Sequence, residues 1–153
     1  MNDLPKNPVD EAQELYTKRV ALYHRFFMDI LRYHQALAAF FMKSSYTRQG
    51  IRVLDVGYGS GVVTKSLYDI ANRKGFQGVT FYAFDLTEAM LNLFRQWLTE
   101  NEAGNIELAQ ADVLQLGQIP KHWKDYPLIV SSATLEHLTK TEIKNALCNL
   151  RQR

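Results

Sequence analysis

The stretch VLDVGYGSG, residues 53–61, decides how this sequence folds. Its first half is a short apolar run, and its second half places a glycine at every other position, at Gly57, Gly59 and Gly61. Glycine accepts positive φ and has no Cβ to keep a bound molecule away from the backbone. Apolar residues at helical spacing follow from Val63, and a helix N-terminus presents unpaired N–H groups that favour a carboxylate or a phosphate. The stretch therefore predicts a strand, a ligand-binding turn and a helix in succession.

Beyond this stretch, short apolar runs alternate with segments of helical periodicity. This alternation, from Gly50 onward, predicts repeated βα units and a parallel sheet, which is an α/β fold. The expected strands are residues 51–56, 79–84, 106–111 and 128–132. Helices are expected from Val63 to near Gly75, from Thr87 as N-cap to before Gly104, and from Thr139 to the end, where Thr139 and Glu142 form a capping-box sequence.

The N-terminal segment has a different pattern. Residues 9–43 contain neither glycine nor proline, and their apolar residues recur at helical spacing. We expect one or two helices that pack as a cap over the sheet, and a lid in which Tyr23 or Phe27 touches a substrate is the alternative. The whole chain, residues 1–153, is then one domain with a helical cap at residues 1–49 and a βα core at residues 50–153.

The composition of the 153 residues fits one globular domain, with 46% hydrophobic and 22% charged residues. This balance excludes a disordered or fibrous chain. The 18 Lys and Arg against 16 Asp and Glu give a net charge of +2, with no basic face that would indicate a nucleic-acid partner. Cys148 has no second cysteine for an internal disulfide, and no apolar run is long enough for a membrane span or an export leader. We therefore expect a cytoplasmic protein without a membrane anchor.

The spacing of the glycines distinguishes between ligands. In the dinucleotide fingerprint G-x-G-x-x-G/A the last glycine or alanine is the sixth residue, and counted from Gly57 that place holds Val62. The pattern D-x-G-x-G-x-G of residues 55–61 instead resembles the donor-binding loop of the class I S-adenosylmethionine-dependent methyltransferases. Asp85, at the end of the second expected strand, and Asp112, just after the third, lie where that family keeps its adenosine contacts.

The resemblance implies a Rossmann-like, mostly parallel sheet of about four strands in the order 3-2-1-4, with the N-terminal helices as a cap. Full members of the family have about seven strands, so the C-terminal half of their sheet would be absent here. Residues 128–132 would then form an edge strand, although their apolar sequence is typical of a central one. Three explanations stay open: a shortened chain, a strand supplied by a partner or by a second copy in a homodimer, and a fold that shields the edge in another way.

The resemblance also implies S-adenosylmethionine as the methyl donor, with no metal, and places it on individual residues. Gly57, Gly59 and Gly61 would pack against its methionine and ribose portions, with Asp55 near its amino group. Asp85 would accept hydrogen bonds from both ribose hydroxyls, and Asp112 would accept one from the adenine amino group. The full set of implied donor contacts is Asp55, Gly57, Tyr58, Gly59, Gly61, Asp85, Leu86, Asp112, Val113 and Ser131.

The resemblance continues through DYPLIVSSATLEHL, residues 125–138, as the fourth strand and the loop beneath the transferred methyl group. It implies a methyltransferase that acts on a small-molecule acceptor. A sulfonium methyl group is already activated, and alignment alone can contribute roughly 7 to 11 kcal/mol, so a catalytic base is optional. His137 and Tyr23 are the candidates for a base if the acceptor must lose a proton.

Plainer interpretations of these residues stay open beside the functional ones. The glycine loop could be a structural turn, Asp85 could cap the helix near Thr87, and Asp112 could be an ordinary turn aspartate. His137 could be a structural histidine, and the four histidines lack the spacing of metal ligands. For the protein as a whole, the alternatives are a noncatalytic S-adenosylmethionine-binding or assembly domain and an oxidoreductase with a nucleotide cofactor.

Overall fold

The computed structural model describes residues 22, 25–26, 36–37, 40, 45 and 48–153. Four strands form one parallel sheet: β1 (Arg52–Val56), β2 (Thr80–Asp85), β3 (Ile106–Gln110) and β4 (Leu128–Ser131). Their order across the sheet is β3-β2-β1-β4. The α/β class, the four parallel strands and the order 3-2-1-4 predicted from the sequence are confirmed.

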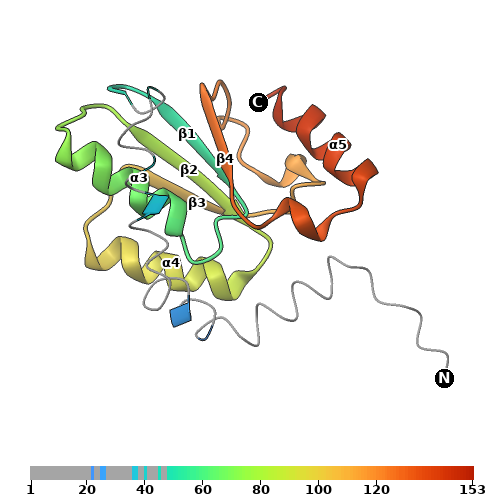
Figure 1. Cartoon of the computed structure of the whole chain (residues 1–153), viewed down its shortest axis with the longest axis horizontal. Coiled ribbons are helices and arrows are strands. Elements are labelled where there is room, and N and C mark those ends of the chain that lie inside the picture. The colour runs from blue at the N-terminus through green and yellow to red at the C-terminus, as the bar shows by residue number, and fades with distance from the viewer. Residues whose placement is uncertain (1–21, 23–24, 27–35, 38–39, 41–44, 46–47) are drawn as a thin grey trace.

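Helices cover both faces of this sheet. They are α3 (Val62–Arg73), α4 (Glu88–Glu100) and α5 (Lys140–Leu150), with the short 3-10 helices η2 (Leu116–Gln118) and η3 (Leu135–His137). Figure 1 shows α3 and α4 on one face and α5 on the other. The predicted capping box begins α5, because the Thr139 hydroxyl accepts from the Glu142 N–H and the Glu142 carboxylate accepts from the Thr139 N–H at 2.8 Å. Thr87 stands at the predicted N-cap position of α4, but its side chain makes no capping hydrogen bond.

The strands bury side chains on both faces, because successive residues of a strand point to opposite sides. The layer under α3 and α4 includes Val53, Leu67, Phe81, Met90 and Phe94. The layer under α5 includes Leu54, Tyr82, Phe84, Trp123 and Leu150. Two packed layers hold the strands in register, so the loops at their carboxyl ends start from fixed positions.

The N-terminal part of the chain is described at a few positions only. The predicted helical cap of residues 9–43 lies mostly outside the described residues, and Tyr23 and Phe27 lie outside them as well. Leu37 is half-buried and packs against the layer under α3 and α4. In the described part of the chain, no helix is long and apolar enough to cross a membrane.

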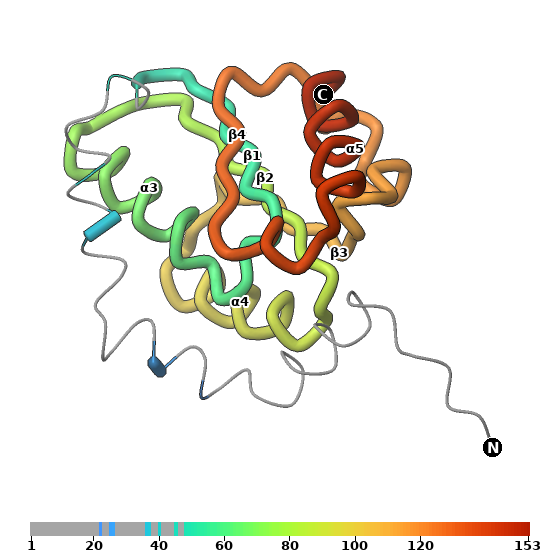
Figure 2. The backbone as a smooth tube through the Cα atoms, turned by 45° about the vertical axis from the view of Figure 1, so that its right-hand side comes forward, coloured from blue at the N-terminus to red at the C-terminus, as the bar shows by residue number. Residues whose placement is uncertain are grey.

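The strand β4 lies at the edge of the sheet, with β1 as its hydrogen-bonded neighbour within the described residues. Figure 2 traces β4 alongside β1, with α3 to one side and α5 to the other. Residues 128–130 of β4 are half-buried and Ser131 is exposed, whereas residues 53–56 of β1 are buried. A sequence typical of an interior strand therefore stands at the rim of the sheet, as expected.

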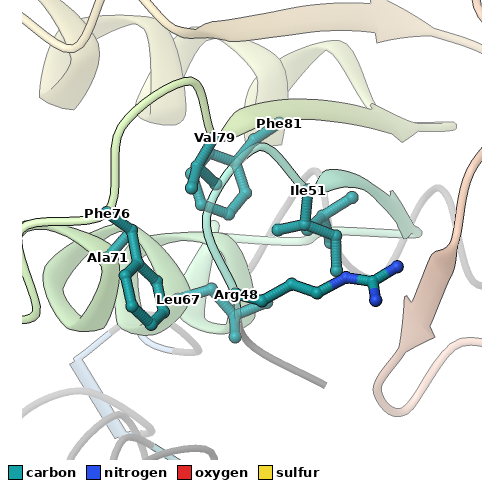
Figure 3. Close-up of a pocket in the computed structure, with 8 residues that line it drawn as sticks. Arg48, Ile51, Leu67, Ala71, Phe76, Val79 and Phe81 are labelled. Atoms are coloured by element: carbon teal, nitrogen blue, oxygen red, sulfur yellow. The ribbon is translucent and has the colours of Figure 1, made fainter. Parts of the chain in front are cut away.

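A small apolar cavity lies between α3 and the amino ends of β1 and β2 (Figure 3). Figure 3 shows Leu67 and Phe76 on one side of it and Val79 and Phe81 on the other. The full lining is Arg48, Ile51, Val53, Leu67, Ala71, Phe76, Val79 and Phe81. Because Val79 directly precedes β2, this cavity is at the opposite end of the strands from the glycine loop and is separate from the candidate site.

Candidate functional site

The candidate site is built on the glycine loop, residues 57–61, which joins β1 to α3. Its three glycines have φ values of 68° at Gly57, 54° at Gly59 and 80° at Gly61. Residues with a Cβ rarely adopt this left-handed region. The backbone N–H of Gly57 donates to the carbonyl of Phe84 in β2 at 2.9 Å. This bond follows the last β1–β2 pair, Val56 with Phe84, so the loop starts beside the carboxyl end of β2.

Asp85, the last residue of β2, directs its carboxylate toward this loop. Its Oδ2 accepts from the Gly59 N–H and its Oδ1 from the Thr87 N–H, each at 2.9 Å. The residue is only 9% exposed, and burial raises the pKa of its carboxyl while the backbone hydrogen bonds oppose the rise. Asp85 thus contacts both the glycine loop and the start of α4. Each carboxylate oxygen keeps a further lone pair for another donor.

Asp55 lies in β1 beneath the loop and is 1% exposed. Its Oδ2 accepts a hydrogen bond of 2.7 Å from the Thr64 hydroxyl on the first turn of α3. Burial raises the pKa of the Asp55 carboxyl to about 7, the Thr64 hydrogen bonds oppose the rise, and the charge of Asp85 adds to it. The carboxyl therefore carries a proton over part of the neutral pH range.

Three polar atoms in and beside the loop are buried and have no hydrogen-bond partner within the residues that the structure describes. They are Asp55 Oδ1, the Tyr58 hydroxyl and the Ser60 hydroxyl, and the described residues contain two further examples, at Arg52 Nε and the Tyr126 hydroxyl. Leaving such an atom unsatisfied costs roughly 1 to 3 kcal/mol. The grouping of three of them within residues 55–60 is typical of a site that meets polar groups of a ligand.

Asp112 follows β3 and forms a tight local turn. Its Oδ1 accepts from the Leu114 N–H at 2.8 Å, and its own N–H donates to the Gln118 side chain at 2.8 Å. This is the turn geometry that the plainer interpretation of Asp112 expects. Val113 is buried, and the Leu86 carbonyl beyond β2 accepts from the Gln110 side chain at 3.0 Å. The ends of β2 and β3 are thus tied together beside the glycine loop.

Two hydroxyls after β4 reach back to the carboxyl end of β1. The Ser131 hydroxyl donates to the Val56 carbonyl at 2.9 Å. The Thr134 hydroxyl lies 3.0 Å from the Gly57 carbonyl and 3.2 Å from the Val56 carbonyl. Ser131 was predicted from the sequence, whereas Thr134, Thr64 and Ser60 were not. Asp55 stands inside an apolar strand, and Thr64 stands near the start of the next helix. This pattern of a carboxylate in a strand followed by a threonine on the next helix could have indicated the contact between them.

His137 belongs to η3 and stands beyond this loop. Its Nε2 lies 3.8 Å from Glu136 Oε1, and its backbone N–H donates to the Thr134 carbonyl at 3.3 Å. Tyr23, the other candidate base, lies outside the described residues. Among the described residues, no group of three or more His, Cys, Asp or Glu side chains is placed to hold a metal ion.

Residues 53–153 match the family model described as a methyltransferase domain, and this range is more than half of the 153 residues. A search of curated proteins finds no match. Solved methyltransferase structures share the fold. A protein from Methanococcus maripaludis assigned as an S-adenosylmethionine-dependent methyltransferase has a TM-score of 0.68 at 14% identity, over 98% of this chain and 62% of its own.

Magnesium protoporphyrin IX methyltransferase from Synechocystis, solved with bound S-adenosylmethionine, has a TM-score of 0.73 at 18% identity, over 98% of this chain and 73% of its own. A protein from Galdieria sulphuraria assigned as a sarcosine dimethylglycine methyltransferase has a TM-score of 0.59 at 19% identity, over 78% of this chain and 43% of its own. The chain thus spans between 43% and 73% of the lengths of these three structures. Together with the match of residues 53–153, the glycine loop and the strand order place this chain in the methyltransferase-domain family, with the class I S-adenosylmethionine-dependent methyltransferase fold.

Proposed function

We propose that this chain binds S-adenosylmethionine at the carboxyl ends of β1, β2 and β3 and transfers its methyl group to a small-molecule acceptor. The observation that carries the proposal is the Asp85 carboxylate, whose Oδ2 lies 2.9 Å from the N of Gly59. Open α/β sheets bind ligands in the crevice beyond the carboxyl ends of their strands. We also propose that residues 1–153 form one cytoplasmic methyltransferase domain, in which residues 50–153 are the donor-binding core.

The buried polar atoms of the site fit the polar groups of this donor. Asp55 Oδ1, which has no hydrogen-bond partner among the described residues, would accept from the donor's ammonium group. The oxygens of Asp85 each hold one backbone N–H and keep a lone pair for the ribose hydroxyls. Among the described residues, Asp112 Oδ2 accepts a hydrogen bond only from the Gln115 side chain, at 3.5 Å, and it would accept another from the adenine amino group.

The remaining proposed contacts complete the crevice around these carboxylates. Apolar and backbone surfaces of the protein would face the sugar and the base of the donor, and the end of β4 would face its sulfonium. The residues that make these remaining contacts are Gly57, Tyr58, Gly59, Gly61, Leu86, Val113 and Ser131. The Tyr58 and Ser60 hydroxyls are both buried without a hydrogen-bond partner in the described part of the chain, and they are further hydrogen-bond donors available inside the loop.

The bound donor would supply an activated methyl group, and the protein would chiefly orient the two reactants. Rigid placement by two packed core layers suits that role, since alignment can account for roughly 7 to 11 kcal/mol of a barrier. No strong base from the chain is then required. His137 and Tyr23 stay the candidates for a base if the acceptor is a hydroxyl or an amine that must lose a proton.

The edge position of β4 supports a second candidate function, a noncatalytic donor-binding or assembly domain. The backbone of an edge strand is free to pair with another chain, and Leu147 of the adjacent α5 is 52% exposed. In this candidate a second copy or a strand-supplying partner covers β4. Donor binding would survive without turnover, because the proposed donor contacts lie mainly on β1, β2 and β3.

A thermal-shift comparison followed by product analysis tests the proposal. S-adenosylhomocysteine, the demethylated product, at 100 times its Kd should stabilise the fold by about 2.7 kcal/mol and raise Tm by several degrees, whereas NAD should not. Incubation with S-adenosylmethionine and a mixture of small-molecule acceptors should then give a methylated product by mass spectrometry. Binding without product favours the noncatalytic candidate, and stabilisation by NAD alone contradicts both.

A further inference from the structure

The Thr134 hydroxyl lies among three backbone carbonyls at the end of β1 and after β4. Its distances are 3.0 Å to the Gly57 oxygen, 3.2 Å to the Val56 oxygen and 3.2 Å to the Ser132 oxygen. A hydroxyl has one hydrogen to donate, so these carbonyls share it. Thr134 and Gly57 are 77 residues apart in the sequence. The contact therefore joins the loop after β4 to the glycine loop.

The side chain of Thr134 also fills the space that a side chain at Gly57 would need. A Cβ built on Gly57 would lie 2.2 Å from Thr134 Oγ1 and 2.3 Å from its Cγ2. Distances below 3.0 Å are essentially never seen for real Cβ atoms. At this position the missing Cβ admits a side chain of the protein itself, in addition to permitting the φ of 68°.

Both backbone polar groups of Gly57 therefore make hydrogen bonds, one with β2 and one with the loop after β4. Its N–H donates to the Phe84 carbonyl of β2 at 2.9 Å, and its carbonyl accepts from Thr134 after β4 at 3.0 Å. Rotation of the peptide plane between Gly57 and Tyr58 would break the second of these bonds. The same rotation would displace the next N–H groups along the loop, including the Gly59 N–H that meets Asp85 at 2.9 Å.

We propose that Thr134 is a positioning residue that holds the glycine loop in the conformation that binds the donor. The inference rests on the proposed function for the identity of the ligand, and on the contacts above for the anchoring of the loop. Thr134 acts through Gly57 and not by touching the donor. The segment between β4 and η3 is thereby linked to donor binding.

Three variants separate the hydroxyl of Thr134 from its packing. Thr134→Val keeps the shape of the side chain and removes its hydroxyl, the hydrogen-bond donor. Thr134→Ser keeps the hydroxyl and removes the side-chain methyl group. Thr134→Ala replaces the valine variant if that variant does not fold. Thr99→Val is the matched control, because the Thr99 hydroxyl donates to the Arg95 carbonyl at 3.1 Å on an exposed turn of α4. Each variant is measured for hydrogen exchange of the Gly59 amide by NMR, for its Kd with S-adenosylhomocysteine by calorimetry, and for Tm.

Thr134→Val should speed exchange of the Gly59 amide and raise the Kd for S-adenosylhomocysteine, each by roughly 3-fold to 10-fold, as expected for one lost hydrogen bond. Thr134→Ser should stay within about 2-fold of the wild type, and Thr99→Val should change neither quantity. Unchanged exchange in Thr134→Val, or equal losses in the valine and serine variants, would overturn the inference. If the wild type does not bind S-adenosylhomocysteine and Thr134→Val still speeds exchange, the proposed ligand is wrong and the anchoring of the loop by Thr134 is supported.

Discussion

The Asp85 carboxylate accepts a hydrogen bond from the Gly59 N–H at 2.9 Å, so the end of β2 and the loop after β1 meet across neighbouring strands. The two residues are 26 positions apart in the sequence. The same carboxylate also accepts from the Thr87 N–H at 2.9 Å, so the start of α4 is fixed to the same group. Three elements of the candidate site thus share one buried carboxylate, and changes to it should affect ligand binding more than changes to any single turn.

Gly57→Ala should destabilise the fold, because the residue has a φ of 68° and its new Cβ would collide with Thr134. The combined cost of the left-handed backbone and the collision is about 2 to 4 kcal/mol. Urea unfolding followed by far-UV circular dichroism measures it. Gly75→Ala is the matched control, because Gly75 has a similar φ of 65° and a Cβ built there meets none of the described residues, its chain neighbours aside, within 4 Å. Equal stability of the two variants would contradict the contact between Gly57 and Thr134.

Asp55 should make the stability of the protein fall as the pH rises from about 4 to about 7. Asp55 has a pKa of about 7 in the folded state against its ordinary value of 3.8, so the folded protein binds this proton more tightly than the unfolded chain. The resulting penalty is absent below the unfolded pKa, grows between the two values, and is complete above the folded one. A shift of this size corresponds to at most about 4 kcal/mol.

The Asp55→Asn variant tests this origin directly. Urea unfolding at several pH values between roughly 5 and 8 should show a clear decline for the wild type and a shallower one for the variant. The asparagine oxygen can still accept from the Thr64 hydroxyl, so that contact is kept. Glu102→Gln, at an exposed position, is the control and should keep the wild-type slope. If the unfolding free energy of Asp55→Asn changes with pH as steeply as that of the wild type, a group other than Asp55 causes the pH dependence.

Binding of S-adenosylhomocysteine should weaken as the pH falls from roughly 7.5 to 6. Its ammonium group would be attracted by the ionised form of Asp55, and protonation of that carboxyl removes the attraction. The expected change in Kd is several-fold, up to about 10-fold for each pH unit below the folded pKa. Calorimetry at constant ionic strength measures it. A Kd that does not change with pH, or an equal change in Asp55→Asn, would contradict the placement of the ammonium group at Asp55.

The sequence predicted those parts of the fold that depend on local pattern. An apolar run before Gly57 located β1, an apolar run after Gly78 located β2, and the Thr139 and Glu142 pair located the start of α5. These signals act within a few residues. The N-cap of α4 shows where local reasoning stops. Thr87 has the residue type and the position of an N-cap, but its side chain makes no capping hydrogen bond. Its backbone N–H donates instead to the Asp85 carboxylate.

The contacts that sequence reasoning missed join distant parts of the chain. Thr134 meets Gly57 across 77 positions, and neither periodicity nor a motif connects them. The Ser60 hydroxyl is buried and has no hydrogen-bond partner among the described residues. Its burial depends on the conformation of the glycine loop, which the spacing of the glycines in the sequence does not determine. The placement of Asp85 at the end of β2 and of Asp112 just after β3 was predictable, because the carboxyl ends of parallel strands meet at one edge of the sheet. The contacts that support these residues depend on packing.

Titration calorimetry of S-adenosylhomocysteine into the wild type and the Asp85→Ala variant tests the central claim most directly. The wild type should bind with a stoichiometry near one, and Asp85→Ala should lose at least about 10-fold in affinity, since charge-assisted hydrogen bonds contribute about 1.5 to 3 kcal/mol each. Glu88→Gln, at an exposed position in the first turn of α4, should bind as the wild type does. No binding by the folded wild type, or equal affinity in Asp85→Ala, would contradict the account.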